Sequence, residues 1–135
     1  MTMGSRGASS GIAKNGKRYG TEYRTIYQSG NIKFVMKNQG RATAPMETMT
    51  RGRVYATVNT QDQIKHITYY DKHNKRYKQI DVEGPGHIVN GAKIIPHTHK
   101  GYEHIEHGTR APSQREWRMI ERVRRTWYNY LSKRK

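Results

Sequence analysis

An amphipathic helix is predicted in residues 113–131, and it constrains how the remaining residues can fold. Ser113 and Glu116 have the spacing of a capping box, in which each side chain binds a backbone N–H group at the start of a helix. At about 100° per residue, the apolar side chains that follow share a face about 80° wide. They are Trp117, Ile120, Val123, Trp127 and Leu131. Because an apolar face must be buried, we expect the helix to pack on a sheet.

Several short segments before the helix have the composition of β-strands. Apolar, β-branched and aromatic residues recur in them with the two-residue period of a strand. These segments are residues 30–36, 53–58, 64–70 and 76–82. The last three are joined by turn-rich connectors, so we predict an antiparallel meander. Residues 37–52 contain Gly and Pro and are predicted to form a loop.

The last strand of the meander is predicted to have two distinct faces. Tyr77 and Gln79 are expected to share one face, and Lys78, Ile80 and Val82 are expected to share the other. A mixed polar and apolar strand of this kind is typical of a strand that lies near a functional site.

A second hairpin is predicted after the Gly84-Pro85-Gly86 break. Two short apolar segments flank Asn90-Gly91, a dipeptide that favours two-residue hairpin turns. The predicted fold class is therefore α+β, with a small antiparallel sheet (meander plus hairpin) packed by a C-terminal amphipathic helix. Residues 1–20 are rich in Gly, Ser, Lys and Arg and are predicted to form a flexible basic arm. Residues 21–135 are predicted to form a single α+β domain.

The chain offers few large aliphatic residues for a core. Ile, Val, Leu and Phe make up about 14% of it, and the formal net charge is +16, a combination usual in disordered chains. Ten Tyr and two Trp supply large side chains that bury area and keep a polar edge. We therefore expect a thin core supported by aromatic residues. The absence of Cys excludes disulfides and thiolate metal sites, and no apolar run is long enough to span a membrane.

The positive charge is concentrated in two flanks. Residues 1–53 carry a net charge of +8 and residues 110–135 carry +7, whereas residues 54–109 carry only +1. Two basic flanks around a near-neutral centre favour a polyanionic partner. We predict nucleic acid as that partner, with RNA favoured over DNA, and no membrane association.

Arginine residues form a stripe on the helix side opposite the apolar face. They are Arg115, Arg118, Arg122 and Arg125. The planar guanidinium group suits bidentate phosphate contacts, so we predict that these residues and Lys100 bind nucleic acid. The alternative interpretation is a solvated helix face.

All seven histidines lie in the near-neutral centre, and three of them are candidates for a common site. His97 and His99 are two residues apart, so in an extended chain they point to the same side. His87 precedes the Asn90-Gly91 turn and is predicted to lie across from them. His66 and His73 fit isolated surface or hydrogen-bonded residues better than site residues.

The first use of such a cluster is acid–base cleavage of a phosphodiester. One imidazole takes a proton from a ribose 2′-OH and another gives a proton to the leaving 5′-oxygen. A cation or hydroxyl then stabilises the charge that develops on the phosphate. The candidate catalytic residues are His97, His99, His87, Lys78 and Tyr77. This chemistry needs no cofactor and no metal.

The second use of the histidine cluster is to bind a metal ion, and the third is a purely structural role. His87, His97 and His99 would form a three-histidine ligand set. Further ligands would come from Glu103, His104, Glu106 or His107. The spacing matches no common zinc motif such as H-E-x-x-H, so the prediction assigns no metal ligands.

Several segments resemble a module found at the C-termini of phage head-morphogenesis proteins and in bacterial polymorphic toxins. The resemblance lies in residues 4–11, 19–23, 43–49, 69–81 and in Pro96-His97-Thr98-His99. It implies a toxin-type ribonuclease of the barnase–EndoU–colicin–RelE kind, which acts without metal. The residues that match are His97 and His99, followed by Tyr77, Lys78 and His87. In that family a helical or irregular part precedes the sheet, whereas here the strongest predicted helix follows it.

Three functions remain open from the sequence. The favoured one is a toxin-like ribonuclease with metal-independent histidine chemistry. The alternatives are a non-enzymatic nucleic-acid-binding module of a phage or conjugative element, and a metal-dependent nuclease. A toxin implies an acidic immunity protein as partner, and a location in the cytoplasm or delivery into the cytoplasm of a target cell.

Overall fold

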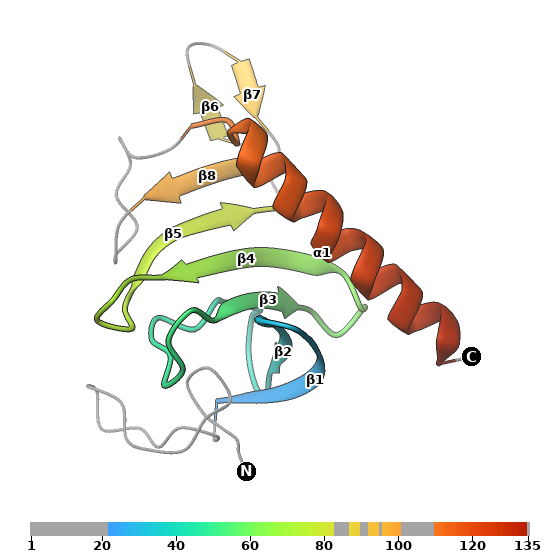
Figure 1. Cartoon of the computed structure of the whole chain (residues 1–135). Helices are drawn as coiled ribbons and strands as arrows, with labels where there is room; N and C mark the ends of the chain where they lie inside the picture. The colour runs from blue at the N-terminus through green and yellow to red at the C-terminus, as the bar shows by residue number, and fades with distance from the viewer. Residues whose placement is uncertain (1–21, 83–86, 90–91, 95, 101–109, 135) are drawn as a thin grey trace.

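The computed structural model describes residues 22–82, 87–89, 92–94, 96–100 and 110–134, and it has an α+β architecture. A six-stranded sheet has the order β1-β2-β3-β4-β5-β8, and helix α1 lies across one of its faces (Figure 1). The strands are β1 Tyr23–Ser29, β2 Ile32–Lys37, β3 Val54–Val58, β4 Ile64–Tyr70, β5 Arg76–Asp81 and β8 His97–Lys100. The helix spans Gln114–Lys133. These elements confirm the predicted fold class.

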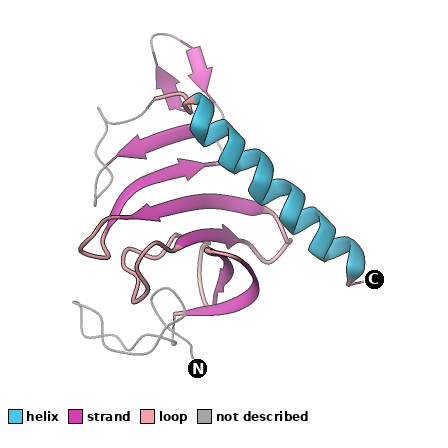
Figure 2. Cartoon of the chain, viewed as in Figure 1, coloured by secondary structure: helices cyan, strands magenta, loops and turns pink. Residues whose placement is uncertain are grey.

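The meander and the second hairpin form as predicted. Strands β3, β4 and β5 pair antiparallel in sequence order. Strands β6 (His87–Val89) and β7 (Ala92–Ile94) also pair antiparallel. They form a separate two-stranded sheet beside the main one, as Figure 2 shows. The predicted basic arm at residues 1–20 lies outside the described residues.

Two features of the main sheet differ from the prediction. Strand β1 was not predicted, and it pairs with β2 through a two-residue turn in which Gly30 has a φ of +59°, a conformation that favours glycine. Strands β2 and β3 run parallel rather than antiparallel. The reason is that residues 38–53 return, over the face opposite α1, to the end of the sheet at which β2 begins. Strand β3 therefore runs in the same direction as β2.

Helix α1 begins and packs largely as its sequence predicts. Ser113 is the N-cap, and its side chain and that of Glu116 complete the capping box. Ile120, Val123 and Trp127 are buried against the sheet. Trp117 was predicted on the buried face but is exposed, because the first turn directs Glu116 rather than Trp117 toward the sheet. Leu131 is partly buried at the edge of the core.

Aromatic rings extend the core between the helix and the sheet. The Phe34 and Trp127 rings stack with centroids 5.0 Å apart. Tyr130 stacks on Trp127 at 5.2 Å and on Tyr27 at 4.6 Å. The Trp127 indole N–H also donates to the carbonyl of Asp62, which fixes the helix to the β3–β4 turn. A chain with few aliphatic residues thus covers its sheet with rings that keep polar contacts.

The sheet face opposite α1 is covered in part by residues 38–53. Tyr23, Val35, Tyr55 and Tyr70 form a buried cluster on it. The Tyr23 hydroxyl donates to the carbonyl of Thr43, and the Tyr70 hydroxyl donates to that of Pro45. This face therefore mixes tyrosine packing with polar groups, and His66, His97 and His99 lie on it. In the described part of the chain, no helix is long and apolar enough to cross a membrane.

Candidate functional site

Three neighbouring strands place a row of polar side chains on the sheet face opposite α1. His66 on β4 pairs with Asp81 on β5, and Asp81 pairs with His97 on β8. In the next row, Gln79 pairs with His99. Side chains of paired residues point to the same face, and every second residue along a strand does so too. The register alone therefore gathers these five side chains.

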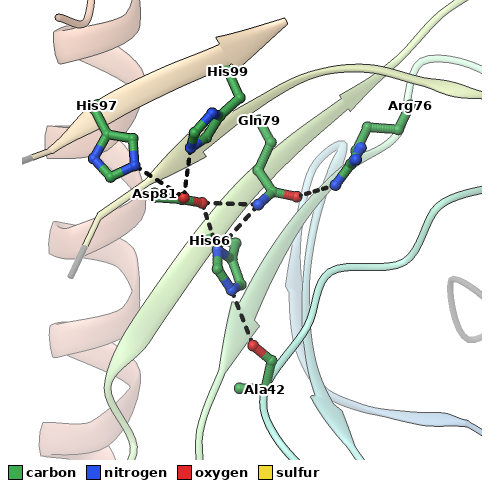
Figure 3. Close-up of polar contacts among 7 residues, drawn as sticks. All are labelled: Ala42, His66, Arg76, Gln79, Asp81, His97 and His99. Carbon is green, nitrogen blue, oxygen red and sulfur yellow. Dashed lines mark hydrogen bonds and ion pairs between the residues drawn. The ribbon is translucent and has the colours of Figure 1, made fainter. Parts of the chain in front are cut away.

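The Asp81 carboxylate is the centre of this group, which we call the Asp81 cluster (His66, Gln79, Asp81, His97 and His99). One oxygen, Oδ1, accepts hydrogen bonds from His66 Nδ1 at 2.7 Å and from Gln79 Nε2 at 2.8 Å. The other, Oδ2, lies 3.1 Å from His97 Nε2 and 2.9 Å from His99 Nε2 (Figure 3). The three imidazoles are thus oriented by a single carboxylate.

Both ring nitrogens of His66 have hydrogen-bond partners. Its Nδ1 lies 2.7 Å from Asp81 Oδ1 and 3.3 Å from Gln79 Nε2, and its Nε2 lies 2.9 Å from the carbonyl oxygen of Ala42. A carbonyl oxygen only accepts hydrogen bonds, so Nε2 carries a proton. His66 is thus held between Asp81 on β5 and Ala42 in the segment before β3.

Burial and the neighbouring histidines have opposite effects on the pKa of Asp81. Burial alone raises the pKa of this carboxyl, but the hydrogen bonds from His66 and His99 and the charge of His66 outweigh it. The pKa of Asp81 therefore lies well below its usual range. The carboxylate stays ionised near neutral pH and keeps its acceptor role for the imidazoles.

A cavity of about 340 Å³ adjoins the Asp81 cluster. His66, Gln79 and Asp81 lie on its wall together with the cationic residues Arg76 and Lys37 and the acidic residue Glu22. The Arg76 guanidinium donates to Gln79 Oε1 at 2.8 Å, which links it to the cluster (Figure 3). The side chains of His97 and His99 are each only 4% exposed, so His66 is the imidazole on the cavity side.

Of the predicted catalytic residues, His97 and His99 come together, whereas Lys78 and Tyr77 do not join them. Lys78 lies on the helix side of the sheet, where its ammonium group is 3.0 Å from a Glu116 carboxylate oxygen. Tyr77 was predicted to share a face with Gln79. A bulge leaves it without a partner in β4, since Tyr69 pairs with Lys78 and Tyr70 pairs with Arg76. Arg76 therefore takes the place beside Gln79, and Tyr77 lies near Tyr69.

The third predicted histidine is not across from the other two. His87 pairs with Ile94 in the β6–β7 hairpin, whereas the strand beside His97 and His99 is β5. The prediction placed His87 across from His97 and His99 because these two residues directly follow the second segment of its hairpin and Pro96. The side chain of His87 lies outside the described residues.

The predicted nucleic-acid-binding arginines are all exposed on α1. Three of them line a second cavity of about 240 Å³ with Tyr69, Lys78 and Met119; they are Arg115, Arg118 and Arg122. Lys100 is exposed at the end of β8. Because α1 packs on the other face of the sheet, the arginine stripe and the Asp81 cluster face opposite sides of the molecule.

Donor atoms suitable for a metal ion also meet in the Asp81 cluster. One ligand atom each from Asp81, His97 and His99 lies within 4.8 Å of the others. This set differs from the predicted alternative, because Asp81 takes the place of His87. The other four residues of that alternative, at 103–107, lie outside the described residues.

Sequence reasoning missed His66, Gln79, Asp81 and Arg76. One signal for them was present: in the predicted 64–82 hairpin, His66 and Asp81 stand opposite each other on one face.

No family model, no curated protein and no solved structure matches this chain.

Proposed function

We propose that this protein is a metal-independent endoribonuclease whose acid–base chemistry is carried by the imidazoles held on Asp81. The observation that carries the proposal is the convergence of His66, His97 and His99 on one carboxylate beside a cavity with two cations. Two titratable groups of opposite protonation state within reach of one phosphate are what ribose-assisted cleavage needs. The resemblance to toxin-type ribonucleases supports the same activity.

The proposed reaction uses the 2′-hydroxyl of the substrate as the nucleophile. The 2′-OH proton passes through the Asp81 carboxylate, which lines the cavity, to a neutral imidazole of His97 or His99 behind it, while O2′ attacks the phosphorus. The P–O5′ bond breaks, and the imidazolium of His66 gives its proton to O5′. The products are a 2′,3′-cyclic phosphate and a 5′-hydroxyl, so no water and no metal enters this step.

The cations on the cavity wall would stabilise the reacting phosphate. Negative charge builds up on its non-bridging oxygens as O2′ attacks, and fixed positive groups in a partly buried site lower that barrier. Arg76 is held against Gln79, and Lys37 Nζ is 2.9 Å from Thr43 Oγ1. Both side chains are therefore positioned before the substrate arrives.

The dependence on the 2′-hydroxyl gives the test. We expect the protein to cleave a short RNA but not the same sequence made of DNA, because DNA lacks the nucleophile. Equal cleavage of both would rule out this mechanism.

The proposal also includes an acidic immunity protein as partner and delivery into the cytoplasm of a target cell, which the net charge of +16 and the toxin resemblance support.

A non-enzymatic nucleic-acid-binding module is the second candidate, and the arginine stripe favours it. Arg115, Arg118 and Arg122 line one cavity with Lys78, on the side away from the histidines. A phosphate bound there would not reach the Asp81 cluster. Binding on α1 and cleavage at the Asp81 cluster are thus separable, and each has its own variants.

Removing one stripe arginine is expected to weaken RNA binding and its salt dependence together. We expect Arg118→Ala to weaken binding several-fold and to lower the slope of log K against log salt by about 1. Arg124→Ala removes the same charge from an exposed position of α1 outside that cavity and is the matched control. Fluorescence anisotropy over a salt series measures the affinity and the salt slope of each variant. Identical slopes for the two variants would refute the role of Arg118.

A further inference from the structure

Two of the three distances among the ligand atoms of Asp81, His97 and His99 are close to those in a zinc site. In tetrahedral zinc sites with bonds of about 2.0–2.1 Å, neighbouring ligand atoms lie about 3.3 Å apart. Asp81 Oδ2 is 3.1 Å from His97 Nε2 and 2.9 Å from His99 Nε2. All three ligand atoms lie within 4.8 Å of one another, so an ion that replaces the two shared protons would draw the two imidazoles closer together.

The surroundings of these three groups also suit a metal site. All three lie on paired strands, so their backbone positions are fixed by the β5–β8 register. The second Asp81 oxygen accepts from His66 and Gln79, which orients the carboxylate as outer-shell partners do in metal sites. The histidine side chains are 4% exposed and that of Asp81 is 14% exposed, so few water molecules compete for an ion.

The donor types select the kind of ion. Two imidazoles and one carboxylate suit Zn²⁺ and similar first-row ions, whereas Mg²⁺ and Ca²⁺ prefer oxygen ligands alone. Zn²⁺ binds the deprotonated nitrogen of an imidazole, the same atom that otherwise exchanges a proton. An ion here and acid–base chemistry by His97 or His99 would therefore exclude each other.

We propose that Asp81, His97 and His99 bind one Zn²⁺ ion, and that the bound ion switches off RNA cleavage. The binding site stands on the geometry of the described residues alone. The inhibition rests on the proposed function, because it requires the imidazoles to be the catalytic groups. The fold thus contains an off state that is set by the availability of a metal ion.

Binding is tested with the metal alone on the untagged full chain. After removal of metal with EDTA and dialysis, a Zn²⁺ titration should show one ion per chain bound at the site. Asp81→Asn, His97→Gln and His99→Gln should each weaken binding at least about tenfold. Asp71→Asn and His73→Ala make comparable changes in the β4–β5 turn, outside the Asp81 cluster, and should leave Zn²⁺ binding unchanged. Circular dichroism checks that each variant is folded.

Co²⁺ provides a second readout that does not depend on affinity or activity. A site with two imidazoles and a carboxylate gives Co²⁺ visible absorption bands of a low-symmetry, four- or five-coordinate ion. These bands should appear with the wild-type chain and be absent with Asp81→Asn. No Zn²⁺ binding, or equal binding by all five variants and the wild type, would overturn the site.

Cleavage assays then separate the inference from the function on which it rests. One equivalent of Zn²⁺ should reduce RNA cleavage at least tenfold, and EDTA should restore it. Site-bound Zn²⁺ with unchanged cleavage would overturn the off switch. Site-bound Zn²⁺ in a chain that never cleaves RNA would overturn the proposed function and leave the site intact. Cleavage that requires Zn²⁺ would overturn both the off switch and the metal-independent mechanism.

Discussion

Replacing His66 by Asn is expected to reduce RNA cleavage at least about 100-fold while the protein stays folded. The Asn amide nitrogen lies near the position of His66 Nδ1, so it can still donate to Asp81. What it lacks is a proton that it can give up. For His97 and His99, which face Asp81 through Nε2, Gln is the matching replacement, and a similar loss is expected from at least one of them.

The controls for these variants separate chemistry from stability. His73→Gln makes the same change at an exposed histidine outside the Asp81 cluster and should keep wild-type cleavage. Initial rates on a fluorogenic RNA and urea unfolding curves should be measured for each variant. If His66→Asn and both Gln variants cleave at the wild-type rate with unchanged stability, the imidazoles are not the catalytic groups.

Glu116→Ala is expected to destabilise the protein by about 4 kcal/mol, more than any other single change considered. The Glu116 side chain is 2% exposed, and it binds Arg110 through both of its carboxylate oxygens. It also accepts from Lys78 at 3.0 Å and from Thr98 at 3.0 Å. Its loss leaves buried donors on β5 and β8 unsatisfied and removes the capping box of α1.

The same carboxylate predicts how stability depends on pH. Burial raises the pKa of Glu116, but hydrogen bonds from Arg110, the Ser113 backbone and Lys78 outweigh it and place the pKa well below its usual range. A lowered folded-state pKa gives stability that is complete above the unfolded-state value, near 4.5, and is lost as the pH falls below it. The difference between wild type and Glu116→Gln should therefore be largest at pH 6–7, about 2–3 kcal/mol, and should shrink toward pH 3.

Urea unfolding curves measured at pH 6–7 and at pH 3 check this prediction. Glu121→Ala is the matched control, because Glu121 is exposed on the same helix and should cost less than about 0.5 kcal/mol. A cost for Glu116→Ala as small as that of the control would contradict the buried network that joins α1 to β5 and β8.

Residue patterns within single segments predicted α1 and most of the strands. The capping box and apolar period placed α1, and alternation placed β2 to β5 within about two residues. Asn90-Gly91 predicted the β6–β7 hairpin. Trp117 was misplaced because it lies at the rim of the apolar arc, and Glu116, with four polar partners, took the inward position of the first turn.

The long-range pairings could not be predicted from local patterns. No local pattern between Ala92 and His97 indicates that β8 pairs with β5 rather than with the β6–β7 hairpin. The parallel β2–β3 pair depends on how residues 38–53 cross the sheet. The site followed from these pairings: His97 and His99 were predicted to share a face. Their partners Asp81 and His66 needed the register of three strands.

The most direct test of the central claim is the chemistry of the cut ends. A short RNA is incubated with the wild-type protein in excess EDTA, and its fragments are weighed by mass spectrometry. Acid–base catalysis by the Asp81 cluster predicts fragments with a 2′,3′-cyclic phosphate and a 5′-hydroxyl, and none with His66→Asn. Intact RNA, or fragments with a 5′-phosphate, would contradict the account.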